Sequence, residues 1–207
     1  MLIDLIYIII ISYFIGSFPY GWILVKVFKN ADLKTIGSKS TGVTNVLRAG
    51  YPGLALCTLI LDAGKGAVVV LGTRYFYPEP LVFFDTNVNE EVLAGIFACL
   101  GHIFPIWLRF KGGKGVATAF GTLIAINPII ALLGFLTWLI VAIIFKFSSL
   151  AAIIATIMLP IYIFLPQPSI LWYMVALCMI ILVKHQKNIV RLYKNQETKI
   201  RFKAGKK

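Results

Sequence analysis

Long apolar segments constrain this chain more than any other feature. They lie at residues 2–27, 53–73, 92–108, 116–126, 128–145, 148–165 and 169–184. About 20 apolar residues cross the hydrocarbon core as a helix. Charged residues make up 14% of the 207 residues, whereas soluble domains carry about 25%. The sequence therefore predicts an all-α polytopic membrane protein of about seven transmembrane helices, some short, forming a single integral membrane domain over residues 1–207.

The stretch from Val116 to Phe145 is too long for one ordinary span. Asn127-Pro128 divides it, because a proline disfavours helix in the residue before it. The first half, 116–126, is then too short to cross alone, and we expect a tilted or partly buried helix. No Lys or Arg precedes the first apolar segment, which is also longer than the apolar core of a signal peptide, so we expect it to remain as a helix.

Basic residues predict the orientation. All but two of the 20 Lys and Arg residues follow the first, third or fifth segment or lie at positions 184–207. The positive-inside rule places these regions in the cytoplasm, with the N-terminus outside and a cytoplasmic basic tail at 185–207. Seven crossings satisfy this arrangement. Five crossings with two re-entrant segments have the same parity, with the N-terminus outside and the tail inside, and are the alternative.

The formal net charge of +12 suggests an anionic partner. No nucleic-acid-binding motif is present, so we expect contacts with anionic membrane lipids and none with nucleic acid. The three cysteines lie inside apolar segments without CxxC spacing, and there are only two histidines. We therefore expect no metal site and no cofactor.

Glycines and cations are densest in Gly101–Gly121, which reads GHIFPIWLRFKGGKGVATAFG. Glycines let backbone N–H groups turn toward an anion, lysines add charge, and a helix expected from Val116 favours negative charge at its start. We interpret this second polar segment as a phosphate site. Its candidate residues are His102, Lys111, Gly112, Gly113, Lys114 and Gly115. The alternatives are a basic loop that touches lipid headgroups and, for His102, a purely structural hydrogen bond.

Two further polar segments are predicted at the same cytoplasmic face. The first, 36–50, offers hydroxyl, amide and guanidinium donors suited to a phosphate ester. These donors are Ser38, Thr44, Asn45 and Arg48. A solvated, helix-capping loop is the alternative. The third segment, 184–197, places His185 and Asn188 three residues apart, where both can face one site.

Asp62 and Lys65 lie inside an apolar segment, where charges are costly unless they are paired or face a polar cavity. Their spacing permits an ion pair. A structural pair and a role in positioning site residues both remain open.

The three segments resemble those of the bacterial acyl-phosphate:glycerol-3-phosphate acyltransferase family (PlsY), and the resemblance covers most of the chain. The matching positions are Gly37, Ser38, Gly42, Thr44, Asn45, Leu47 and Arg48; Gly101, His102, Phe104, Pro105 and 110–118; and His185, Asn188, Ile189, Arg191, Leu192 and Glu197. The chain departs at Lys39, Ser40 and Thr41, where the family more often has Gly-Asn-Pro. It also departs at Asn195, where the family usually has glycine. Because asparagine tolerates positive φ, we expect that turn to be kept.

The resemblance implies transfer of a fatty acyl group from acyl phosphate to the 1-hydroxyl of glycerol 3-phosphate, giving lysophosphatidic acid and phosphate. We expect a monomer in the bacterial cytoplasmic (inner) membrane, with the active site at the cytoplasmic face. His185, Asn188 and Lys114 are the candidate catalytic residues. An acyl phosphate is already activated, so no enzyme nucleophile is required.

We hypothesise that Lys114 and the amides of Gly112 and Gly113 hold one phosphate. Ser38, Arg48 and Lys111 hold glycerol 3-phosphate or share the donor phosphate. His185 and Asn188 orient the attacking hydroxyl, whose proton passes to His185 or to a substrate phosphate oxygen.

Two other functions make predictions that the sequence can be compared with. Coenzyme A-dependent glycerophosphate acyltransferases use a histidine with an aspartate five positions later, but Trp107 and Val190 occupy those positions here. A transporter of a phosphorylated small solute also explains intramembrane charge and short helices. It predicts internal repeats and a site near the midplane, whereas no clear repeat is visible and the polar segments are predicted at one face.

Overall fold

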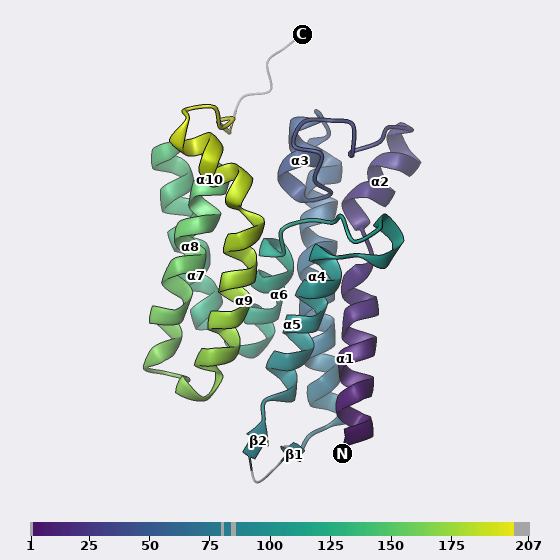
Figure 1. Cartoon of the computed structure of the whole chain (residues 1–207), viewed down its shortest axis with the longest axis vertical. Coiled ribbons are helices and arrows are strands. Elements are labelled where there is room, and N and C mark those ends of the chain that lie inside the picture. The colour runs from purple at the N-terminus through teal and green to yellow at the C-terminus, as the bar shows by residue number, and fades with distance from the viewer. Residues whose placement is uncertain (1, 80, 84–85, 201–207) are drawn as a thin grey trace. The chain divides into compact units, whose positions relative to one another are not determined.

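The computed structural model describes residues 2–79, 81–83 and 86–200. They form two compact units, Met1–Pro128 and Ile129–Lys207, and both units are built from helices (Figure 1). One antiparallel hairpin, β1 (Leu81–Phe83) paired with β2 (Thr86–Val88), is an addition to the predicted all-α fold.

The first unit contains most of the long helices. They are α1 (Leu2–Ser17), α2 (Tyr20–Lys29), α3 (Val43–Arg48), α4 (Pro52–Phe76), α5 (Glu90–Ile103), the 3₁₀ turn η1 (Ile106–Leu108) and α6 (Val116–Ile126). α1 packs along α5, and α4 packs along both α5 and α6. Glycines allow these close approaches, because a Cβ at Gly16 would overlap Ala98 and one at Gly121 would overlap the backbone of Ala63.

The first apolar segment is not one continuous helix. The predicted helix over 2–27 corresponds to one candidate span, Leu2–Lys29, which is interrupted at Phe18-Pro19, where α1 ends before α2 begins. Proline removes a backbone N–H and clashes with the preceding turn, which breaks the helix. The exposed Phe18 carbonyl is satisfied by Lys65 Nζ at 3.0 Å. Membrane helices tolerate such breaks where neighbouring groups complete the hydrogen bonds.

The short α6 begins beside the middle of α4 and ends beside its C-terminal part. A Cβ at Gly66 would overlap the Thr118 carbonyl, and Arg74 Nη2 donates to the Ala125 carbonyl at 3.0 Å. Lys65 lies 13 residues after Pro52, which is about 20 Å at 1.5 Å per helical residue. The start of α6 is therefore recessed below the N-terminal end of α4, and the chain after η1 descends to reach it.

The second unit contains α7 (Pro128–Phe145), α8 (Ser148–Phe164), η2 (Pro168–Ile170), α9 (Leu171–Lys184) and α10 (Gln186–Tyr193). α9 packs on α8, and the buried apolar residues of α9 include Met174, Leu177 and Ile181. A bend of 55° separates the η2–α9 span from α10. The predicted tail 185–207 thus begins as a helix, and its residues 201–207 lie outside the described residues.

The boundaries 116–126 and 128–145 are confirmed, and 53–73, 92–108, 148–165 and 169–184 agree to within a few residues. Within the described residues, four helices are long and apolar enough to cross a membrane, or five if the bent pair forms one span. α6 and α8 are shorter. The chain is an integral membrane protein, while about seven crossings and their orientation stay predictions.

Candidate active site

Asn45 organises the first polar segment. Its side chain is 1% exposed. Its Oδ1 accepts hydrogen bonds from the backbone N–H and the hydroxyl of Ser38, at 2.9 and 3.2 Å. Its Nδ2 donates to three loop carbonyls, those of Leu33, Ile36 and Ser40. Because both ends of the amide bind the loop, Asn45 fixes the backbone that presents Ser38. A contact of Asn45 with substrate stays a prediction.

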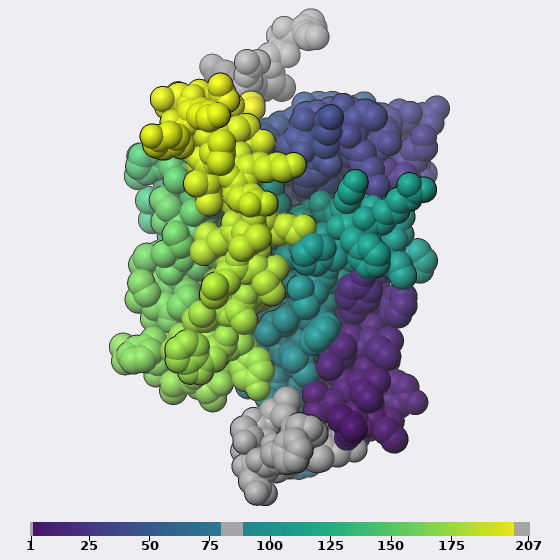
Figure 2. Space-filling view, in the orientation of Figure 1, coloured from purple at the N-terminus to yellow at the C-terminus, as the bar shows by residue number. Residues whose placement is uncertain are grey.

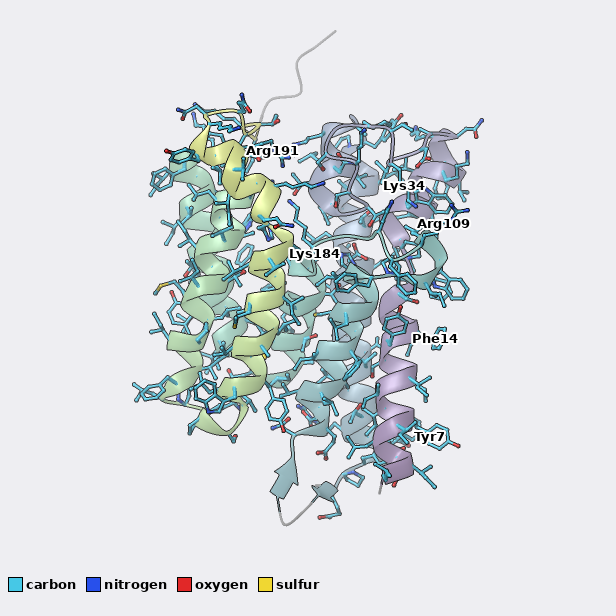
Figure 3. All side chains as sticks on the ribbon, in the orientation of Figure 1. Tyr7, Phe14, Lys34, Arg109, Lys184 and Arg191 are labelled. Carbon is cyan, nitrogen blue, oxygen red and sulfur yellow. The ribbon has the colours of Figure 1, made fainter. Side chains whose placement is uncertain are left out.

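Asp32 anchors the start of the same loop. Its carboxylate accepts from the Lys34 N–H at 2.9 Å and from Trp22 Nε1 at 3.0 Å. The hydrogen bond from the Lys34 backbone holds the pKa of Asp32 below its usual value. Lys34 Nζ lies 3.5 Å from the Leu108 carbonyl in η1. The first and second polar segments therefore lie at the same end of this unit, where Figure 3 labels Lys34 and Arg109.

The second segment folds back on itself through a left-handed turn. Arg109 and Phe110 have φ values of 52° and 60°, a conformation that costs roughly 1–2 kcal/mol for a residue with a Cβ. Phe110 N–H bonds the Pro105 carbonyl at 2.9 Å, while Tyr13 Oη and Trp107 Nε1 tie this region to α1. Figure 2 shows the segment between the purple surface of α1 and the blue surface of residues 30–50.

The amides of Gly112 and Gly113 already have partners. Gly112 N–H donates to the Ile103 carbonyl at 3.2 Å, and Gly113 N–H donates to the His102 carbonyl at 3.1 Å. This corrects the hypothesis that these two amides hold a phosphate, since each serves a backbone carbonyl in this structure. Lys111 is exposed beside them. The glycines permit a close return of the chain onto α5.

The predicted helix start at Val116 is confirmed. Gly115 precedes it with φ of 87°, a conformation that favours glycine. The first amides of an α-helix lack intrahelical partners and carry the positive end of its dipole. The N-terminal end of α6 and the adjacent Lys114 thus form the electropositive part of the second segment. This part is recessed below the N-terminal end of α4.

A buried polar cluster lies beneath this turn. Lys65 Nζ is 2.9 Å from Asp62 Oδ1 and 2.9 Å from His102 Nδ1. The predicted pairing of Asp62 with Lys65 is confirmed. Lys65 Nζ also donates to the Phe18 carbonyl at 3.0 Å, so two hydrogen bonds and one ion pair hold the ammonium group. His102 is buried, and its far ring edge lies against Gly113. The predicted contact of His102 with substrate stays a prediction.

In the second unit, His185 lies at the bend between α9 and α10 and is buried. Its Nδ1 is 2.8 Å from the Ile181 carbonyl. A carbonyl oxygen can only accept, so the ring proton lies on Nδ1 and the lone pair of the neutral ring lies on Nε2. This tautomer suits a group that accepts a hydrogen bond or a proton from a hydroxyl.

Glu197 holds Asn188 and Arg191 together. Its Oε2 accepts from Asn188 Nδ2 at 3.1 Å and from Arg191 Nε at 2.8 Å. Its carboxylate is buried, with 1% of the side chain exposed. Sequence reasoning gave Glu197 no role. A signal was present, because it is the one acidic residue among the many cations of positions 184–207.

Comparison with known proteins assigns the chain to a family. Residues 6–195 match the family described as glycerol-3-phosphate acyltransferase. The chain is 43% identical over 205 residues to the glycerol-3-phosphate acyltransferase of Mesorhizobium japonicum, covering 99% of this chain and 100% of the relative. It is 44% identical over 192 residues to that of Neisseria meningitidis serogroup B, covering 92% and 94%. The chain belongs to the glycerol-3-phosphate acyltransferase family.

Two solved structures of PlsY, described as an integral membrane glycerol 3-phosphate acyltransferase, have the same fold. The glycerol 3-phosphate form superposes with a TM-score of 0.86 at 32% identity and covers 96% of each chain. The lysophosphatidic acid form gives 0.82 at 30% identity and 95% of each chain.

A departure from the acyltransferase family pattern has a clear structural outcome. Asn195 adopts φ of 55°, which confirms that asparagine keeps the turn where the family usually has glycine. Asn195 N–H bonds the Leu192 carbonyl at 3.1 Å, and Gln196 N–H bonds the Arg191 carbonyl at 2.7 Å. This pair of bonds is the Schellman motif that ends many helices. Lys39, at the other departure, also has positive φ, 59°.

The structure therefore brings Ser38, Asn45 and the second segment to one end of the first unit. Arg48 and Thr44 lie on α3 of the same loop. His185, Asn188 and Glu197 cluster in the second unit. The meeting of all three segments of this acyltransferase stays a prediction. Within the described residues, no group of three His, Cys, Asp or Glu side chains is arranged to hold a metal ion.

Proposed function

We propose that this protein transfers a fatty acyl group from acyl phosphate to the 1-hydroxyl of glycerol 3-phosphate, giving lysophosphatidic acid and inorganic phosphate. The observation that carries the proposal is the family match over residues 6–195. The relatives are named glycerol-3-phosphate acyltransferases, and a PlsY structure is described as the lysophosphatidic acid form. The family assignment favours this enzyme over the transporter alternative.

The chemistry needs an orienting site more than a nucleophile. The 1-hydroxyl oxygen attacks the acyl carbonyl carbon, the bond from that carbon to the phosphate oxygen breaks, and phosphate leaves with the electron pair. An acyl phosphate is a mixed anhydride with a good leaving group, so positioning and stabilisation of the leaving charge are the tasks of the protein.

Lys114 and the first amides of α6 are the proposed site for the donor phosphate. The helix start supplies N–H groups and the positive end of the dipole, and Lys114 adds a full charge. Their recessed position suits a donor that is charged at one end and apolar along its chain. Ser38, Arg48, Thr44 and Lys111 are proposed to hold glycerol 3-phosphate, with Asn45 shaping the loop that presents Ser38.

His185 and Asn188 are proposed to orient the attacking hydroxyl. The Nδ1–H tautomer of His185 leaves the lone pair on Nε2, where a hydroxyl can donate. The proton then passes to Nε2 or to a phosphate oxygen. The pH profile of kcat separates these two routes, because replacing His185 by Gln changes the shape of the profile only if the histidine takes the proton.

We place the protein as a monomer in the bacterial cytoplasmic membrane with its site facing the cytoplasm. This placement rests on the basic residues, which the positive-inside rule assigns to that side. A cytoplasmic site gives access to water-soluble glycerol 3-phosphate, while the apolar helices contact membrane lipid and the acyl chain.

The decisive experiment supplies purified protein with labelled glycerol 3-phosphate and one of three donors, which are acyl phosphate, acyl-CoA and an acyl-carrier-protein thioester. We expect lysophosphatidic acid from acyl phosphate alone. Product from a thioester alone would contradict the proposed donor. Uptake of a phosphorylated solute into vesicles with no product from any donor would favour the transporter.

Lys114→Ala and Arg48→Ala test the proposed phosphate contacts in the same assay. We expect turnover to fall by at least about 100-fold in each, because a charge that stabilises the transition state is lost. Lys26→Ala removes an equal charge from the exposed end of α2 and is the matched control. Near-normal rates for both site variants would contradict the assignment.

A further inference from the structure

The requirement for glycine at position 113 has a local cause in this structure. A Cβ at Gly113 would meet three atoms, Nε2, Cε1 and Cδ2, and all three belong to the ring of His102. Among the described residues, the glycines with positive φ are Gly37, Gly50 and Gly115, so the backbone at Gly113 suits any residue. The His102 ring is therefore the first obstacle that a side chain at position 113 would meet.

The ring itself is held from below. Lys65 donates to His102 Nδ1 at 2.9 Å and is anchored by Asp62 and by the Phe18 carbonyl. Both charged side chains are almost completely buried, at 1% and 2% exposure. A buried ammonium held by two hydrogen bonds and an ion pair has a fixed direction, and Asp62 Oδ1 itself lies 3.4 Å from His102 Nδ1. The orientation of the His102 ring is therefore determined by α4 and by the break between α1 and α2.

We propose that Lys65 and His102 are positioning residues for Lys114. Lys65 orients the ring, the ring sets how closely Gly113 approaches α5, and Lys114 follows directly in the chain. The proposal rests on the proposed function, because it explains how Lys114 reaches the donor phosphate. It assigns the glycine at position 113 to packing on His102 and not to close approach of a phosphate.

A double-mutant cycle tests this packing. In His102→Asn, the side-chain oxygen takes the place of Nδ1 and still accepts from Lys65, and Nδ2 takes the place of Cδ2. The two atoms nearest to a Cβ at Gly113, Nε2 and Cε1, are removed. In the wild-type background, Gly113→Ala is expected to lower kcat by about tenfold or more, because overpacking a closed site forces the backbone to move. In the His102→Asn background, the same change is expected to cost less than about twofold.

Two matched variants keep the obstruction in place. Gln at position 102 extends to the position of Nε2, so Gly113→Ala should remain costly in His102→Gln. Gly112→Ala is the second control, because its Cβ would overlap the His102 carbonyl and the Pro105 ring. The His102 carbonyl and the Pro105 ring both remain in His102→Asn, so the penalty of Gly112→Ala should persist in that background.

Lys65 is tested by removing its hold on the ring. Lys65→Met is combined with Asp62→Asn, so that no buried charge is left unpaired. The released ring can rotate away, and the penalty of Gly113→Ala is expected to fall from about tenfold to about threefold. An unchanged tenfold penalty in this background would overturn the role of Lys65.

Each variant is measured for kcat and KM with acyl phosphate and glycerol 3-phosphate, and for its thermal unfolding midpoint in detergent. Thermal unfolding needs no substrate. The double-mutant cycle of unfolding midpoints therefore tests the packing even if the wild-type protein shows no turnover and the proposed function is wrong. Rescue of Gly113→Ala by His102→Asn in both measurements supports the proposal. An equal penalty for Gly113→Ala in both backgrounds overturns it.

Discussion

Single side chains in this protein divide into those that hold the loops and those that the loops present. Asn45 and Ser38 illustrate the division within one segment. All described hydrogen bonds of the Asn45 amide go to the loop 33–40, whereas Ser38 keeps its backbone bond to Asn45 without its hydroxyl. The two residues should therefore fail in different ways when changed.

Asn45→Ala is expected to lower the free energy of unfolding by about 2–3 kcal/mol, because several buried loop carbonyls lose their donor. Ser38→Ala is expected to leave the unfolding midpoint near that of the wild type and to reduce turnover. Thermal unfolding and steady-state rates on the same preparations check both. Normal stability with lost activity in Asn45→Ala would instead make Asn45 a direct substrate contact.

Glu197 is a second residue whose burial makes its hydrogen bonds important for stability. It accepts from Asn188 and Arg191 with only 1% of its side chain exposed, so Glu197→Gln is expected to cost about 2–3 kcal/mol of stability. The Arg74–Glu91 pair is bidentate, through Nε and Nη2, but is far more exposed, at 48% and 26%. Glu91→Gln should therefore cost less than about 1 kcal/mol. Equal losses in the unfolding midpoint would contradict this account.

At the scale of elements, helix boundaries were readable where a single residue type decides them. Asn127-Pro128 predicts the end of α6 because proline acts on its immediate neighbour. The same rule applied to Phe18-Pro19 would have found the first break, which was hidden by the continuous apolar run. The hydrogen-bond partners of the Gly112 and Gly113 amides could not be predicted from the sequence. They are carbonyls of α5, which come near only because the chain folds back onto that helix. Glu197 likewise stands out in the sequence as an acidic residue among cations, but its hydrogen bonds with Asn188 and Arg191 depend on the fold.

The end of α10 supports a prediction about the asparagine at position 195. A left-handed residue with a Cβ is strained, and glycine removes that strain. Asn195→Gly is expected to raise the stability by a few tenths of a kcal/mol, up to about 1. Gln196→Gly, one residue later and outside the positive-φ set of the described residues, should lower it. Unfolding midpoints of the two variants provide the comparison, and a lower midpoint for Asn195→Gly would contradict the Schellman assignment.

At the scale of the whole molecule, apolar length alone does not decide how many helices cross. α6 and α8 fall short of an ordinary span, yet α6 reaches Arg74 at the C-terminal end of α4. In the second unit, Ile200 N–H donates to the Lys146 carbonyl at 2.7 Å. Lys146 and the chain after α10 therefore share one end of that unit, with the whole of α8 and α9 between them. This supports seven crossings over five, since re-entrant α6 and α8 would place Lys146 outside and the tail inside.

Cysteine labelling separates these two arrangements. In a protein whose native Cys57, Cys99 and Cys178 are replaced by Ala, a membrane-impermeant thiol reagent is applied to intact cells and to inside-out vesicles. Lys146→Cys and Lys187→Cys are expected to react only in inside-out vesicles, because the positive-inside rule places both in the cytoplasm. Ser169→Cys, at the exposed middle residue of η2, is expected to react only in intact cells and controls for sidedness. Labelling of Lys146→Cys in intact cells, with Lys187→Cys labelled only in vesicles, would mean five crossings and a re-entrant α8.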